Sequence, residues 1–303
     1  MLTAATLLCA AGSGAAQQVA DSTYRPRVSA PAYAMERGPR VLVDAGHHNF
    51  HTLADRYAPF GVILRADGYR VAAGFAPFDA ASLRGIDVLV IANAGSDDES
   101  SWALPTPSAF TEAEIEAVEA WVEAGGALLL IADHMPAAGA AATLAERFGV
   151  YFTNGYTYQA RPENLPGDLF TRANGLVRDH PITRGRNDGE RIDSVVTFTG
   201  QGFQASGPVD TLLVFARKAV SLLPVDAEAE FDRSTPRVHS GGWLHGAALR
   251  VGRGRVAFFG EASMFSAQVA GPERRPMGLN HARANRNEQL LLNVVHWLSG
   301  VLD

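Results

Sequence analysis

Four short apolar runs, each followed at once by a polar side chain, constrain the fold of this chain most strongly. Near-continuous apolar runs of this length are typical of strands in a parallel sheet that is covered on both faces. The runs and the polar residues after them are Val41–Val43 with Asp44, Asp87–Ala92 with Asn93, Ala127–Ala132 with Asp133, and Arg255–Gly260 with Glu261.

Helical patterns separate these runs. Thr111 and Glu114 have the spacing of a capping box, and an apolar stripe follows them up to Gly125. A last helix is expected to begin near Asn285, with Glu288 in its first turn. Strands that alternate with helices predict an α/β fold, a doubly wound, mostly parallel sheet with helices on both faces. The weak pattern from Val150 to Gly189 predicts a long binding loop or lid.

The expected organisation is a leader, a linker and one domain. Residues 1–16 are apolar and end in small residues, which is typical of a secretory signal peptide, although no Lys or Arg lies near Met1. Residues 17–38 contain prolines and read as a linker, and residues 39–303 as a single α/β domain. The protein is therefore expected in the periplasm or secreted, with no transmembrane segment in the mature chain.

Charge and cysteine usage exclude two function classes. The formal net charge is −6 and no long basic run occurs, which argues against binding to nucleic acid. The single cysteine, Cys9, lies inside the predicted signal peptide. A mature chain would contain no thiol, so we expect neither disulfides nor a cysteine nucleophile.

The polar residues after the strands point to a site. The carboxyl ends of parallel strands meet at one edge of a sheet, and ligands bind there. His47 and His51 are four residues apart, a spacing that lets two imidazoles share a metal ion when they lie on a helix. Asp133, His134 and Glu261 could complete a nitrogen and oxygen shell for zinc or manganese, and a bound metal would activate water for hydrolysis.

Two alternatives stay open at this point. In a metal-free site, His134 or His47 would act as the base, oriented by Glu261 or Asp133. Asp44 and Asp133 could instead be caps of turns or helices. Further candidates for ligand binding share a position near the same sheet edge; they are Asp44, His48, Asn49, Asn93, Ser263 and Gln268.

Three segments carry a family resemblance: FTEAEIEAVEAWVEAGGALLLIADH, HPITRG and GRGRVAFFGEASMF. Over residues 40–298 the chain resembles the class I glutamine amidotransferase-like superfamily. More narrowly, it resembles an uncharacterised bacterial branch related to gliding-motility and intraflagellar-transport domains. The resemblance implies a flavodoxin-like sheet with a site at its edge.

The resemblance does not extend to the nucleophile of that superfamily. In amidotransferases the turn after the central strand carries a catalytic cysteine, and the matching turn here is Ile131–Pro136. Asp133 and His134 stand where the cysteine is expected, and Glu261 is alone where the family has a histidine and an acid. The chain is therefore not expected to be a cysteine-dependent glutamine amidotransferase.

Two functions of different class are compatible with these patterns. One is an exported, metal-assisted hydrolase that acts on a carbohydrate or another small polar compound. The other is a non-catalytic module that binds a ligand or a partner protein through the same pocket.

Overall fold

The computed structural model describes residues 18–96, 102–159, 167–227 and 231–303. The predicted signal peptide, residues 1–16, lies outside the described residues. Within the described residues, no helix is long and apolar enough to span a membrane.

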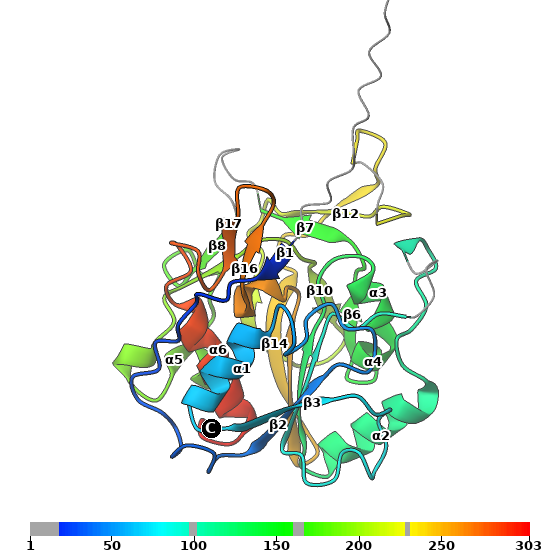
Figure 1. The fold of residues 1–303 in the computed structure, drawn as a ribbon. Coiled ribbons are helices and arrows are strands. Elements are labelled where there is room, and N and C mark those ends of the chain that lie inside the picture. Colours follow the sequence, from blue (N-terminus) through cyan, green and yellow to red (C-terminus); the bar gives the residue numbers. More distant parts are fainter. Residues whose placement is uncertain (1–17, 97–101, 160–166, 228–230) are drawn as a thin grey trace, which may run out of the picture.

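A nine-stranded mixed sheet forms the centre of the molecule (Figure 1). Five strands pair in parallel, in the order β3 (Arg70–Gly74), β2 (Arg40–Asp44), β4 (Val88–Ala92), β5 (Ala127–Ile131) and β15 (Gly254–Phe259). The other four join by antiparallel pairing, and they are β14 (Leu244–Val251), β10 (Phe203–Ala205), β6 (Val150–Phe152) and β11 (Asp210–Val214).

The predicted doubly wound, flavodoxin-like fold is therefore wrong, because nearly half of the large sheet is antiparallel and smaller sheets surround it. The physical reason lies in the connection between β14 and β15. Only Gly252 and Arg253 separate these strands, and a two-residue turn can join only antiparallel neighbours. Gly252 has φ +55°, a left-handed conformation that suits glycine in such a turn.

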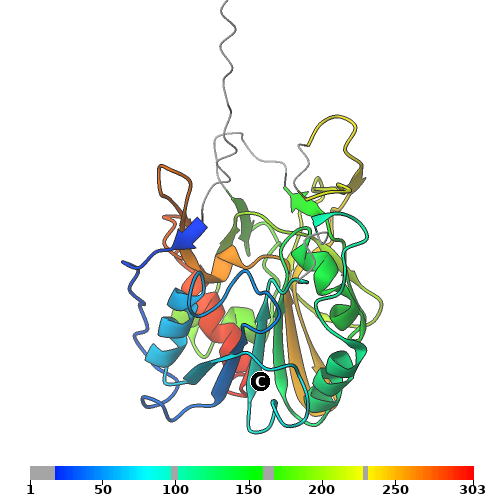
Figure 2. The ribbon, with the colours of Figure 1, turned by 45° about the vertical axis from the view of Figure 1, so that its right-hand side comes forward.

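Helices cover both faces of the sheet (Figure 2). One face carries α1 (Ala58–Ala66) and α6 (Asn287–Leu298), and the other carries α2 (Glu112–Glu123), α3 (Ala137–Ala140) and α4 (Ala142–Glu146). Along β4 the side chains alternate between the two resulting cores. Val88 and Val90 pack with the α1–α6 layer, whereas Leu89 and Ile91 pack with the α2 layer. Burial on both faces explains why this strand is apolar throughout.

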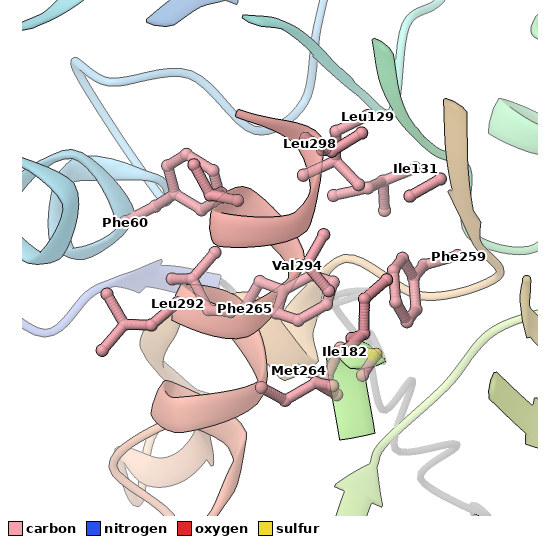
Figure 3. Packing of buried hydrophobic residues seen from close by; sticks show 14 of the residues in the cluster. Phe60, Leu129, Ile131, Ile182, Phe259, Met264, Phe265, Leu292, Val294 and Leu298 are labelled. Atoms are coloured by element: carbon pink, nitrogen blue, oxygen red, sulfur yellow. The ribbon is translucent and has the colours of Figure 1, made fainter. Parts of the chain in front are cut away.

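The predicted last helix is α6, and its apolar stripe fills the larger core. Val294 and Leu298 lie beside Leu129 and Ile131 of β5 in Figure 3. Glu288 lies in the first turn of α6, as expected, although no side chain caps this helix. Glu288 instead accepts hydrogen bonds from the Tyr24 hydroxyl and, at 2.6 Å, from the Arg27 backbone N–H.

The capping box at α2 is confirmed: the Thr111 side chain accepts from the Glu114 N–H, and the Glu114 carboxylate accepts from the Thr111 N–H.

Smaller elements lie around the end of the large sheet at which β4 and β5 finish (Figure 1). The long loop expected between Val150 and Gly189 is in fact interrupted by short strands and a helical turn, although residues 160–166 lie outside the described part. Three small sheets are formed by β1 (Gln18–Ala20) with β16 (Ala267–Ala270) and β17 (Arg275–Gly278); by β13 (Arg237–His239) with β12 (Val220–Leu222) and β7 (Tyr156–Tyr158); and by β8 (Asp168–Thr171) with β9 (Ser194–Thr197). The remaining turns of helix are α5 (Pro181–Arg184), η2 (Asp188–Glu190) and η3 (Ser263–Phe265).

Residues 18–38 lie along the surface of the domain rather than apart from it. β1 pairs with β16, and the Ala32 N–H donates to the Asp67 carboxylate at 2.7 Å. Asp67 also bonds the buried His296 of α6 at 2.6 Å. The N-terminal segment is therefore held at several points, one of which is next to the site described below.

Candidate functional site

A pocket of about 240 Å³ lies where β4 and β5 end. Its walls come from the segments that follow these strands, from the loop after β2, from η3 and from the N-terminal strand β1. Its polar lining residues are Gln18, His48, Asn93, Ser96, Asp133, His134, Thr199 and Ser263.

Asn93 fixes the position of Asp133. Its φ of +49° turns the chain sharply after β4, a conformation that asparagine tolerates better than most residues. The Asp133 backbone N–H donates to Asn93 Oδ1 at 2.8 Å, and Asn93 Nδ2 donates to Asp133 Oδ2 at 2.8 Å. Because a backbone N–H can only donate, the first bond identifies the amide oxygen and so settles the orientation of the Asn93 side chain.

That orientation also determines the protonation of His51. Asn93 Nδ2 lies 3.2 Å from His51 Nδ1. Since Nδ2 is a donor, Nδ1 accepts, and the neutral ring carries its proton on Nε2. Burial lowers the pKa of His51 to about 3, so the ring is neutral near pH 7. Its Nε2 is buried and has no hydrogen-bond partner among the described residues.

Asp133 and Glu261 form a pair of buried carboxyl groups. Asp133 lines the pocket, and its second oxygen accepts from the N–H of Ala262, the residue after Glu261. Burial raises the pKa of Asp133, although charge on His134 and the bond from Asn93 oppose this rise. Burial raises the pKa of Glu261 well above its ordinary value, and the nearby Asp133 charge raises it further. Two such groups retain a proton at a pH at which isolated carboxylates are ionised.

Glu261 is held from one side only. Its Oε2 accepts from the Met264 N–H at 2.9 Å at the start of η3. The Ser263 hydroxyl and the Phe198 N–H partly oppose the rise in its pKa, but neither meets hydrogen-bond geometry with Oε1. Glu261 Oε1 is thus a buried polar atom without a partner in the described part of the chain, directly behind the pocket residue Asp133.

His134 presents a basic nitrogen beside this pair. Its Nδ1 lies 2.7 Å from the Met135 carbonyl, which can only accept, so Nδ1 carries the proton and Nε2 has a free lone pair. The ring stacks on Tyr156 of β7, with centroids 4.0 Å apart and planes 18° from parallel. The ring is partly exposed and lines the pocket. Asp133 and His134 therefore line the same pocket, and Glu261 is buried behind them.

His47 belongs to a separate, buried network. Its Nδ1 lies 3.0 Å from both carboxylate oxygens of Asp44, and its Nε2 lies 2.9 Å from Glu114 Oε1. Asn49 Nδ2 donates to the same Asp44 carboxylate at 3.0 Å. Burial opposes protonation of His47, but its bonds to the two carboxylates raise its pKa. This network supports the loop after β2.

The sequence-predicted residues thus fall into three groups. His48, Asn93, Asp133, His134 and Ser263 line the pocket, as predicted from their positions after strands. A second group lies one layer behind them, in contact through hydrogen bonds or charge: His51, Glu261 and Gln268. The third group, Asp44, His47 and Asn49, forms the buried network and does not line the pocket.

These positions do not fit the expected metal shell. Both nitrogens of His47 are engaged by carboxylates, and His51 Nδ1 is engaged by Asn93. Across the described ranges, no three His, Cys, Asp or Glu side chains are grouped so that they could hold a metal ion. A divalent metal prefers several such donors converging on one point, and the described residues do not provide them.

Sequence reasoning missed several lining residues, among them Gln18, Phe50, Trp102 and Thr199. Gln18 falls in the segment interpreted as a linker, yet its Oε1 accepts from Gln268 Nε2 at 3.3 Å. The same Gln268 nitrogen donates to Ser263 Oγ at 3.1 Å. Phe50 lies between His47 and His51 in the sequence, and only the polar residues of that segment were considered as site residues. No sequence pattern marked Trp102 or Thr199.

No known family model matches the chain. No curated protein matches its sequence either. Solved structures do match, among them the N-terminal domain of mmIFT52. That domain is 15% identical, with a TM-score of 0.61 over 86% of this chain and 97% of that one. At this identity the likeness is one of fold.

Other structural neighbours are less similar. A ThuA-like protein from Bacteroides uniformis is 15% identical, with a TM-score of 0.47 over 88% of this chain and 93% of that one. PurLQS from Thermotoga maritima is 14% identical, with a TM-score of 0.45 over 86% of this chain and 99% of that one.

Proposed function

We propose that the pocket is a metal-independent acid–base site that hydrolyses a small, polar, uncharged compound. The observation that carries this proposal is the buried pair of Asp133 and Glu261, whose pKa values are both raised. Perturbed carboxyl groups in a concave, partly apolar site are typical of catalytic acids. A purely structural role would not require two buried carboxyl groups, because burial of an ionisable group costs free energy.

The proton transfers follow from the hydrogen bonds. His134 Nε2 accepts a proton from water, and the water oxygen forms a bond to the electrophilic carbon of the substrate. The carbon–oxygen bond to the leaving group breaks, and Asp133, which lines the pocket, donates a proton to that oxygen. Each transfer by a positioned group contributes about 10²- to 10⁴-fold to the rate of such a reaction.

The surrounding residues support this assignment of roles. Asn93 is bonded to both the backbone and the side chain of Asp133, so that the carboxyl group keeps one orientation. The same Asn93 amide holds His51 as a neutral ring with Nε2–H directed away from it. We assign both residues to positioning rather than to proton transfer.

Three variants test the proposal: Asp133→Asn, Glu261→Gln and His134→Gln. Each keeps the size of the side chain and removes its proton-transfer ability, and Glu146→Gln at an exposed position of α4 is the matched control. On a panel of uncharged chromogenic esters and glycosides, we expect each site variant to lose at least about 100-fold in kcat/KM, and the control to lose nothing. Activity in all three site variants within threefold of wild type would exclude the proposed roles.

The non-catalytic alternative is kept because of one finding. The fold is similar to that of the mmIFT52 N-terminal domain, which supports placing the chain in the branch related to gliding-motility and intraflagellar-transport domains. In that case the pocket would bind a ligand without turnover. Ligand binding that is retained together with no hydrolysis of any bound compound would favour this alternative.

Export is proposed on the sequence of residues 1–16 alone. The test is N-terminal sequencing of the protein after expression in a bacterial host and fractionation of the cells. We expect a mature chain beginning near residue 16 or 17 in the periplasmic fraction. An uncleaved chain confined to the cytoplasm would contradict this proposal.

A further inference from the structure

The size of the pocket restricts its ligand. Pockets for drug-sized ligands have volumes of roughly 300–1,000 Å³. The present pocket, at about 240 Å³, is smaller than this range. A ligand of one ring fits such a space, whereas a nucleotide or an extended peptide could be only partly enclosed.

The charges around the pocket restrict the chemical class of the ligand further. No lysine or arginine is among the described residues that line it. Phosphate and carboxylate ligands are normally bound by such cations or by bidentate arginine. The buried Asp133 would in addition repel an anion whenever it is ionised. The pocket therefore selects against anionic ligands.

The polar lining is mostly uncharged and hydrogen-bonding. Gln18, Asn93, Thr199 and Ser263 contribute amide and hydroxyl groups from four different segments. Amide and hydroxyl groups of this kind favour a ligand with several hydroxyl groups, each of which can both donate and accept.

Two aromatic side chains complete the lining. Phe50 and Trp102 both line the pocket, and each is 47% exposed. The Arg56 guanidinium lies 3.7 Å from the centroid of the Phe50 ring and holds that ring from one face. Half-exposed aromatic rings beside uncharged polar groups offer apolar surface for the C–H faces of a ring that bears hydroxyl groups on its edge.

We propose that the ligand is a single uncharged polyhydroxylated ring, a monosaccharide unit or a cyclic polyol, which lies against Phe50 and Trp102. This inference deepens the proposed function, because it names the chemical class of the compound that the acid–base site would hydrolyse. The acid and the base would then act on the glycosidic oxygen of a substrate that carries this ring.

The test is a calorimetric titration of the full-length protein with glucose, methyl glucoside, myo-inositol, glucuronate and tetramethylammonium. We expect at least one of the three neutral rings to bind, and glucuronate to bind at least about tenfold more weakly than glucose because no cation lines the pocket. Phe50→Ala and Trp102→Ala should each weaken binding of the neutral ring by at least about threefold. The control is Phe75→Ala, an aromatic residue that is 73% exposed and does not line the pocket.

Three results would overturn the inference: binding of none of the neutral rings, tighter binding of glucuronate than of glucose, or binding of tetramethylammonium alone. Folding of the aromatic variants is checked by their melting temperatures. The two proposals fail separately. If the Asp133→Asn variant binds the neutral ring and the wild type never turns over a glycoside, hydrolysis is excluded and the proposed ligand class is retained. If the wild type hydrolyses another neutral compound but binds none of the rings, the proposed ligand class is excluded and hydrolysis is retained.

Discussion

His47 is expected to be one of the strongest single contributors to stability outside the apolar core. The variant His47→Gln removes a cation that bridges two carboxylates, Asp44 and Glu114, whose side chains are 0% and 10% exposed. Removing one partner of a buried ion pair costs about 3–5 kcal/mol, because the remaining charge stays buried without compensation. For a domain of this size, each kcal/mol lowers the melting temperature by about 2–4 °C. The expected decrease is therefore roughly 6–20 °C.

The pH dependence has a sign that distinguishes this explanation from simple loss of packing. The pKa of His47 is raised in the folded state, so its contribution is fully present below the unfolded value of 6.5 and is lost as pH rises through the folded value. Burial opposes ionisation of Glu114, but hydrogen bonds from His47, Thr111 and Phe78 lower its pKa to about 2. Its contribution is therefore present above pH 4.5 and is lost below it.

The assay is urea unfolding of wild type and His47→Gln at pH 5.5 and at pH 9. The difference in free energy of unfolding should be largest at pH 5.5 and smaller at pH 9, where His47 of the wild type is more nearly neutral. The exposed His239→Gln is the matched control and should change stability by less than about 0.5 kcal/mol. A loss below 1 kcal/mol at pH 5.5, or a loss equal at both pH values, would refute the reasoning.

Three further predictions concern the acid pair, the metal and the core. Because the folded state of Glu261 binds its proton more tightly than the unfolded state does, its contribution to stability falls as pH rises above 4.5. Glu261→Gln should therefore be more stable than wild type at pH 8 but not at pH 4, by thermal unfolding; a variant less stable than wild type at pH 8 would contradict this. Equimolar zinc or manganese should leave the melting temperature of the wild type unchanged, and a rise that a chelator reverses would show that the donor argument is wrong. Leu291→Ala, in the fully buried stripe of α6, should cost about 2–5 kcal/mol in urea unfolding, and a cost below 1 kcal/mol would mean that α6 packs differently.

The sequence was sufficient for the parts of the fold that depend on local pattern. The continuous apolar run Val88–Ala92 required a strand buried on both faces, and the spacing of Thr111 and Glu114 required a capping box. The antiparallel half of the sheet was missed although its signal was present. Only Gly252 and Arg253 connect β14 to β15, and two residues are too few for a parallel crossover.

The site was predictable only as far as strand ends are predictable. Asn93, Asp133 and Glu261 come together because each follows a parallel strand of one sheet. The split between His47 and His51 was not predictable, because it depends on the tertiary position of Glu114, a residue identified only as a helix cap. Gln18 lies at the pocket because β1 pairs with β16, and this pairing cannot be predicted from the local sequence pattern.

Asp133, which lines the pocket, and Glu261, which is buried beside it, should both keep a proton at a pH at which isolated carboxylates are ionised. The most direct measurement is a carbon-13 NMR titration of the side-chain carboxyl groups in wild type, Asp133→Asn and Glu261→Gln. We predict that two carboxyl signals titrate above their ordinary pKa values of 3.8 and 4.5, and that each variant removes one signal and lowers the pKa of the other. Titration of every carboxyl group at or below its ordinary value would contradict the account.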